Sequence, residues 1–97
     1  MPAYVIVDIL QTTDEKKMEQ YRAAVTPTVQ KHGGRYICVG GPFEVKEGSW
    51  KPTFPVILEF PDLAAANRWY DSPEYTPLKA LRMAATRGNM VFLQGLK

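Results

Sequence analysis

Six side chains of the sequence are our candidates for chemistry on a small molecule, because together they offer proton transfer, a cation and aromatic surface. The predicted catalytic acids and bases are Asp8, His32 and Glu59. The predicted substrate-binding residues are Tyr4, Arg35 and Trp50. In this hypothesis the carboxylates and the imidazole exchange protons with a substrate, and the guanidinium orients an anionic group.

Each candidate also has a purely structural interpretation. Asp8 and Glu59 can pair with Arg35 or lie near strand ends in water. His32 follows a predicted helix, and the negative end of the helix dipole makes a histidine suitable as a surface cap there. Trp50 lies in a predicted loop, so its ring can pack on its own fold or on a partner subunit instead of a ligand.

The segment HGGRYICVGG, residues 32–41, contains the only histidine and the only cysteine of the chain. A dinucleotide-binding loop places its glycines between a strand and a helix. Here one glycine pair follows a helix and the other precedes extended chain. We interpret the segment as a strand between two turns, with Cys38 facing the core. One histidine, one cysteine and dispersed acids show no metal-ligand spacing, so we expect neither a metal nor a bound cofactor.

Hydrophobic periodicity predicts a mixed α+β chain. Strands are expected where β-branched and apolar residues cluster, at residues 3–11, 35–40, 53–60 and 90–94, with a short edge strand or hairpin arm at 43–48 and a turn at 87–89. Helices are expected from a capping box at Thr12 and Glu15 to the glycines at 33–34, over 63–70 after Asp62, and from Ser72-Pro73 to about Thr86. Pro27 is expected to kink or restart the first helix.

This order of elements predicts a ferredoxin-like βαββαβ sandwich with an antiparallel sheet, formed by residues 1–97 as a single domain. Alternation along the strands separates two faces. The set expected to face the helices is almost purely apolar: Val5, Val7, Ile9, Tyr36, Cys38, Phe54, Val56, Leu58, Phe60, Val91 and Leu93. The set expected on the other face mixes apolar and charged residues: Tyr4, Ile6, Asp8, Leu10, Arg35, Ile37, Val39, Thr53, Pro55, Ile57, Glu59, Met90, Phe92 and Gln94. Because a monomer rarely exposes so much apolar surface, we expect a second copy to cover it.

Composition narrows the classes of partner. The net charge is +2 and the basic residues are scattered, so no basic stripe points to nucleic acid. The first ten residues form neither a leader peptide nor a membrane span. A single cysteine fits a reducing compartment. We therefore expect a cytoplasmic protein that binds neither membrane nor nucleic acid.

Several segments, spread over essentially the whole chain, carry a family resemblance: MPAYVIVDI, HGGRYICVGGPFEVKEG, SWKP, VILEFP and RWYDSPEYTPLKALR. Together they resemble the bacterial family known as domain of unknown function 1330, most specifically in WYDSPEY and in GGPFEV followed by Trp50. The resemblance implies a dimeric α+β barrel, in which two protomers pack sheet against sheet. It also implies a superfamily of cofactor-independent monooxygenases, lactone isomerases, dehalogenase-like and haem-dependent enzymes, with sites between sheet and helices. No catalytic residue is carried over, since fold does not give function.

Two functions stay open at this point for the expected homodimer. The first is a cofactor-independent enzyme that acts on a small organic acid, lactone or aromatic metabolite by acid/base chemistry. The second is a non-catalytic dimer that binds a small molecule or serves as a stress-related accessory protein. A haem-binding relative, with His32 as axial ligand, is a third hypothesis and predicts a Soret band.

Overall fold

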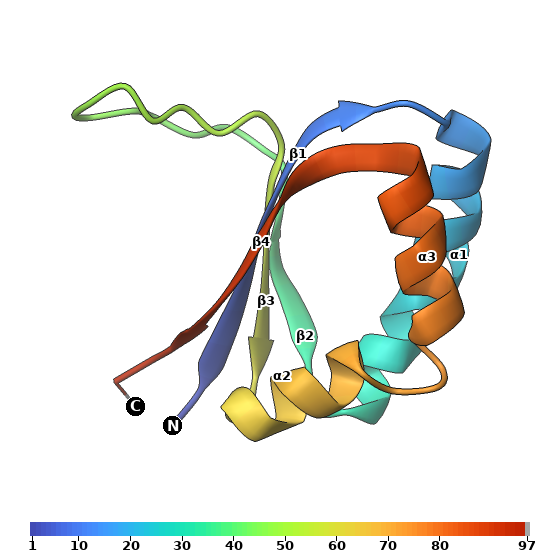
Figure 1. Ribbon diagram of the computed structural model, residues 1–97. Coiled ribbons are helices and arrows are strands. Elements are labelled where there is room, and N and C mark those ends of the chain that lie inside the picture. The colour runs from blue at the N-terminus through green and yellow to red at the C-terminus, as the bar shows by residue number, and fades with distance from the viewer. Residues whose placement is uncertain (97) are drawn as a thin grey trace.

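The computed structural model describes residues 1–96 and has two layers, a four-stranded antiparallel sheet and three helices that cover one of its faces (Figure 1). The strands are β1 (Ala3–Thr12), β2 (Arg35–Val39), β3 (Pro55–Phe60) and β4 (Thr86–Gln94). The helices are α1 (Glu15–Lys31), α2 (Leu63–Tyr70) and α3 (Thr76–Ala85). The sheet order is β2-β3-β1-β4, and all its strand pairs are antiparallel. The predicted ferredoxin-like α+β class is therefore confirmed.

The core lies between the sheet and the helices, and its largest side chains are aromatic. Trp69 and Tyr75 are fully buried, and their ring centroids are 4.2 Å apart. Phe60 of β3 packs against the same indole. The indole Nε1 donates to Thr28 Oγ1 of α1 at 3.1 Å, so the buried polar atom has a partner. Of the helices described, none is long and apolar enough to cross a membrane.

The helix α1 begins two residues later than the predicted capping box. Asp14 is the N-cap, and its carboxylate accepts from Lys17 N at 3.1 Å. Thr12 instead ends β1, where it pairs with β4. The restart of the helix considered at Pro27 does not occur, because α1 runs unbroken through that residue.

The third helix also starts later than predicted. We expected Ser72 to cap it, but α3 begins at Thr76 after a turn. The Ser72 hydroxyl does make a cap-like contact, since it accepts from Tyr75 N at 3.2 Å and donates to Trp69 O at 2.8 Å. The seryl side chain therefore closes the turn between α2 and α3 rather than starting the helix.

The strand β4 has no preceding turn. We expected residues 87–89 to form one, but β4 follows α3 directly at Thr86 and pairs with β1 along its length. Gly88 lies so close to β1 that a Cβ there would be 2.3 Å from the carbonyl oxygen of Asp8. This close approach explains why glycine occurs inside a strand.

The two faces of β4 are the reverse of the prediction. Phe92 lies opposite Val5 and, with Met90, packs against the core on the helix side. Val91 and Leu93 lie on the outer face and are 55% and 54% exposed. Because MVFLQ is apolar in both phases, alternation could not determine which face is buried.

The predicted burial of Cys38 was also wrong. The pairing of β2 with β3 shifts by one residue between Tyr36 and Cys38, which makes Ile37 the extra residue of a bulge. Tyr36 keeps its predicted place on the helix side. Cys38 moves to the outer face and is exposed, and Val39 moves to the helix side, where it lines a cavity.

Residues 40–54, which we call the arm, connect β2 to β3 and extend away from the helices, beyond the outer face of the sheet (Figure 1). The short edge strand or hairpin arm expected at residues 43–48 has no strand in the structure, and these residues form part of the irregular arm. Phe43, Val45 and Trp50 are exposed on it, the last at 78%.

The cap of α1 gives a direct test of the helix boundary. Replacing Asp14 by Ala removes the acceptor for the Lys17 amide, so we expect the free energy of unfolding to fall by about 1 kcal/mol. Thr12→Ala is the matched control and should cost less than about 0.5 kcal/mol. Urea unfolding followed by circular dichroism measures both. A larger loss for Thr12→Ala would restore the predicted capping box and contradict the structure.

Candidate functional site

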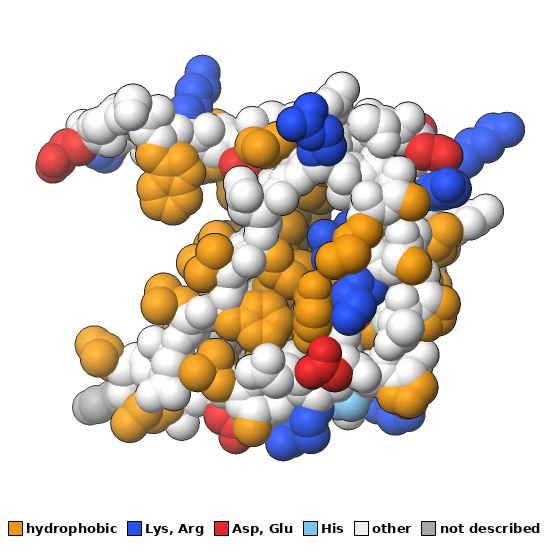
Figure 2. All heavy atoms as spheres, in the orientation of Figure 1, with side chains coloured by type: hydrophobic (Ala, Val, Ile, Leu, Met, Phe, Trp, Pro, Cys, Tyr) orange, Lys and Arg blue, Asp and Glu red, His pale blue; other side chains and the backbone are white. Residues whose placement is uncertain are grey.

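A cavity of about 260 Å³ lies between the sheet and the helices α1 and α3. Figure 2 shows hydrophobic side chains within the hollow between these layers and Lys or Arg side chains at its edge. The sheet contributes mostly apolar residues to the wall, among them Val7, Val56 and Leu58. Phe54, at the base of the arm, contributes an aromatic ring. The cavity is therefore suited to an apolar body.

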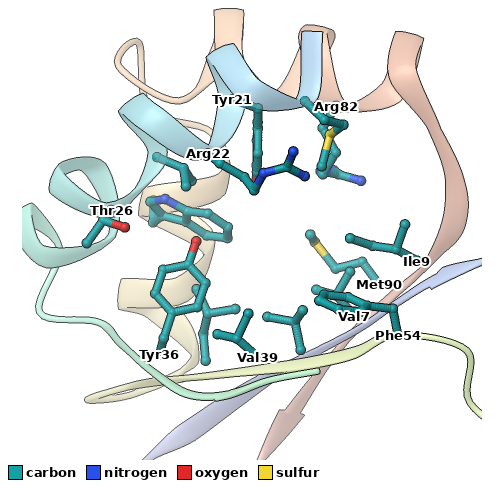
Figure 3. A pocket seen from close by; sticks show the side chains of 15 residues that line it. Val7, Ile9, Tyr21, Arg22, Thr26, Tyr36, Val39, Phe54, Arg82 and Met90 are labelled. Atoms are coloured by element: carbon teal, nitrogen blue, oxygen red, sulfur yellow. The ribbon is translucent and has the colours of Figure 1, made fainter. Parts of the chain in front are cut away.

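Three connected polar side chains lie where α1, α3 and the turn before α3 meet. The hydroxyls of Tyr21 and Tyr75 are 2.8 Å apart, and Arg82 Nε donates to Tyr75 Oη at 3.3 Å. Tyr21 and Arg82 point from the helices into the cavity, opposite Tyr36 of β2 (Figure 3). The cavity thus combines apolar walls with hydroxyl and guanidinium groups.

The cavity tyrosines are hydrogen-bond donors near neutral pH. Burial, with a smaller effect of Tyr75, raises the pKa of Tyr36 to about 12. Burial also raises the pKa of Tyr21, and the neighbouring Tyr75 raises it further. Both hydroxyls therefore stay protonated under ordinary conditions and can stabilise a substrate oxygen, but they cannot act as bases.

The two arginines of the cavity differ in their partners. Arg22 forms an ion pair with Glu15, and both side chains are exposed. Arg82 forms no ion pair with any carboxylate of residues 1–96. The wall contains no Asp, Glu, His, Lys or Cys among the residues described. The charge that a ligand would meet inside the cavity is thus that of Arg82.

A second, more open hollow adjoins the first one. Arg82 and Met90 line both, and the second is also lined by Tyr70 and Arg87. Like the cavity, it has no acidic side chain in the described part of its wall. Arg82 consequently lies between the apolar cavity and the more open second hollow, which is basic.

Four of the six predicted site residues lie on the outer face of the sheet rather than in the cavity; Tyr4, Arg35 and Glu59 are neighbours there, and Asp8 lies further along β1. Arg35 Nε donates to Glu59 Oε1 at 2.8 Å, and Tyr4 is paired with Glu59 in the neighbouring strand. The Asp8 carboxylate accepts from Thr53 N and Phe54 N at 2.9 and 2.8 Å. The pair of Arg35 and Glu59 matches the structural interpretation, whereas Asp8 makes backbone contacts that we did not predict.

The other two predicted residues are separate from this group. Trp50 lies on the exposed arm. His32 is the C-cap of α1, in the helix layer, with Nε2 4.0 Å from Glu74 Oε2. The structure therefore does not bring His32 to Asp8 or Glu59. The catalytic and binding roles of all six residues stay predictions.

Sequence reasoning did not assign the cavity residues to a site. Tyr36 was counted among the core-facing residues, and neither Tyr21 nor Arg82 was among the six candidates. One signal was present in the spacing. Arg82 follows Tyr75 by seven residues, so the two lie on one face of a helix, and Leu78 between them is apolar. A cation on a core-facing stripe is the feature that indicates a site.

The contact between Lys31 and Glu74 should make the stability of the protein depend on pH. The hydrogen bond from the Lys31 ammonium holds the pKa of Glu74 at about 2, below its ordinary 4.5. A carboxylate whose pKa is lower in the folded state contributes stability above pH 4.5 and loses it as the pH falls toward 2. Thermal unfolding of Glu74→Gln should therefore depend less steeply on pH in this range than that of the wild type. Parallel curves for the two proteins would refute the coupling, and Glu19→Gln on the exposed side of α1 is the control.

Comparisons with known proteins agree with this architecture. A protein of unknown function from Rhodopseudomonas palustris has 18% sequence identity and a TM-score of 0.76, over 99% of this chain and 83% of that chain. A dimeric ferredoxin-like protein of unknown function from Jannaschia has 15% identity and a TM-score of 0.71, over 98% and 100%. At these identities the likeness concerns the fold alone.

A third similar structure has a named activity. SnoaB, a cofactor-independent oxygenase from Streptomyces nogalater, has 13% identity and a TM-score of 0.61, over 99% of this chain and 93% of that chain. No match was found among the curated proteins. Within residues 1–96, no group of three or more His, Cys, Asp or Glu side chains could hold a metal ion.

The family described as Domain of unknown function (DUF1330) matches residues 2–96, and the chain belongs to this family.

Proposed function

We propose that this protein is a small homodimeric enzyme that acts on an organic acid, lactone or aromatic metabolite in the cavity between sheet and helices. The observation that carries the proposal is an apolar cavity with an arginine that has no carboxylate partner among residues 1–96. Apolar pockets with a few convergent polar groups are the usual form of small-molecule sites.

The size of the cavity supports a small substrate. Its volume is about 260 Å³, whereas a protein cavity of about 150 Å³ already holds benzene. One or two rings with a polar substituent fit this space. Ring stacking is available from Phe54 and Trp69, which both line the wall.

The polar groups of the cavity support the stabilisation of negative charge rather than general-base catalysis. Arg82 and the protonated hydroxyls of Tyr21 and Tyr36 can stabilise negative charge on a substrate oxygen. The described wall offers no side chain that would act as a base near neutral pH, so the substrate itself must be acidic or already ionised. The similarity in fold to a cofactor-independent oxygenase supports including molecular oxygen as a co-substrate in the test.

Turnover is tested with panels of aromatic carboxylic acids, phenols and lactones, incubated with and without oxygen and followed by mass spectrometry. We expect conversion of at least one class, with kcat/KM lowered by about 100-fold in Arg82→Gln because the oxyanion loses a charged donor. Arg68→Gln, an exposed arginine on α2, is the control for net charge. Binding without any conversion would overturn the enzyme and favour the non-catalytic binding protein.

The homodimer is proposed from the outer face of the sheet. Ile6 of β1 lies opposite both Ile57 of β3 and Val91 of β4, so three apolar side chains form a row across this face. The arm overhangs the same side of the sheet and carries the exposed Trp50 (Figure 1). A second copy, packed sheet against sheet, would remove these side chains from water. The Jannaschia protein, which has the same fold, is described as dimeric.

A charge in this row should separate the subunits. Ile57→Asp places a carboxylate within the apolar row while leaving the core side of β3 unchanged, so we expect monomers. Light scattering on a sizing column should give twice 10.9 kDa for the wild type and 10.9 kDa for the variant. Ala23→Asp, on the exposed side of α1, should remain dimeric. A monomeric wild type, or a dimeric Ile57→Asp, would contradict the proposed interface.

A further inference from the structure

We infer that the ligand of the cavity is an aromatic carboxylate, whose charged group is bound by Arg82 in an orientation that Tyr75 sets. The inference rests on the proposed function and names the substrate class and the binding residue. Four observations carry it: the missing counter-ion, the free edge of the guanidinium, the position of Arg82 between the two hollows and the contrast with Arg22.

The first observation is an uncompensated cation. Arg82 is partly buried, and it forms no ion pair within residues 1–96. A charge removed from water is costly unless an opposite charge or hydrogen bonds compensate it. An anionic ligand supplies that compensation, whereas a neutral one of the same shape supplies less of it.

The second observation is the geometry of the guanidinium. Its only hydrogen bond to the described residues goes from Nε to Tyr75 Oη, which is fixed in turn by Tyr21 Oη. The two Nη groups remain available on the opposite edge. A planar carboxylate can accept from both of them, which gives the bidentate pairing that arginine favours. Tyr75 is thus a positioning residue, because it orients Arg82 without lining the cavity itself.

The third observation gives the direction in which the ligand lies. Arg82 and Met90 separate the apolar cavity from the open hollow that contains Arg87. The apolar body of the ligand is therefore placed toward Val56 and Phe54, and its carboxylate toward the basic hollow. This arrangement keeps the charged end near water and buries the ring.

The fourth observation excludes the other arginine as the anchor. Arg22 lines the same cavity, but Glu15 already neutralises it. A carboxylate placed there would have to compete with an existing partner. Arg22 and Arg82 therefore allow a comparison of two arginines on one cavity wall: Arg22 is exposed and paired with Glu15, whereas Arg82 is partly buried and has no carboxylate partner among the described residues.

The test compares 2-naphthoate with its neutral isostere 2-naphthamide on the full chain at pH 7.5 and constant ionic strength. Isothermal titration calorimetry gives both dissociation constants, and competition between the probes shows whether they share one site. We expect the wild type to bind the carboxylate about tenfold more tightly or better, since hydrogen bonds to charged groups are worth more than neutral ones. Arg82→Gln should reduce this ratio to about one, whereas Arg22→Gln should retain it.

Two further variants keep the test decisive if Arg82→Gln does not fold. Arg82→Lys keeps a cation without the planar fork, so the ratio should fall but stay above one. Tyr75→Phe removes the acceptor of Arg82 Nε and should lower the ratio while the neutral amide binds as before.

The possible outcomes separate this inference from the proposed function. Equal binding of both probes to the wild type, or a ratio that survives Arg82→Gln, would overturn the carboxylate anchor and leave the cavity as a site. Binding of neither probe would overturn the aromatic carboxylate as the ligand, whereas the proposed enzyme is decided by the turnover panels. A ratio lost equally in Arg22→Gln and Arg82→Gln would show general electrostatic attraction and would also refute the specific anchor.

Discussion

The hydrogen bonds of the Tyr75 hydroxyl are the interactions on which both the packing of the helices and the proposed chemistry of the cavity depend. It lies 2.8 Å from the hydroxyl of Tyr21 on α1 and accepts from Arg82 of α3, while its ring packs on Trp69 of α2. A buried hydroxyl must keep its partners, so these bonds fix the three helices relative to one another. The same bonds determine which edge of the guanidinium faces the cavity.

The fold could be predicted wherever one face of an element is clearly apolar. Val5 and Val7 alternate with polar or half-buried neighbours in β1, and this strand was placed correctly. In β4 both phases are apolar, so only pairing with β1 decides the register. The bulge in β2 has no sequence signal of its own. Val25 and Val29 are buried on either side of Pro27, and this packing outweighs the hydrogen bond that proline removes from the helix.

The candidate site was less predictable. Sequence reasoning selects ionisable groups on strands as candidates, and it assigns long side chains at core-facing positions to the core. Arg35 and Glu59 neutralise each other across two strands, which the alternation pattern could only offer as one of two interpretations. Tyr21, Tyr36 and Arg82 satisfy an apolar pattern with their rings and stem, and only their tips are polar. Periodicity therefore counts them as core, and three-dimensional packing is needed to show that their tips meet.

The outer face and the cavity are nevertheless connected, and Asp8 is the connection. Its carboxylate accepts from the backbone amides of Thr53 and Phe54 on the far side of the sheet from the helices. The ring of Phe54 lines the cavity on the near side. The Asp8 carboxylate, which we predicted to be catalytic, thus binds the backbone of Phe54, whose ring lines the cavity. The same hydrogen bonds hold the base of the arm. The backbone of β1 shares this task, because Ile9 N donates to Phe54 O at 3.2 Å. Side-chain and backbone hydrogen bonds of β1 therefore both hold the base of the arm, which overhangs the proposed dimer face.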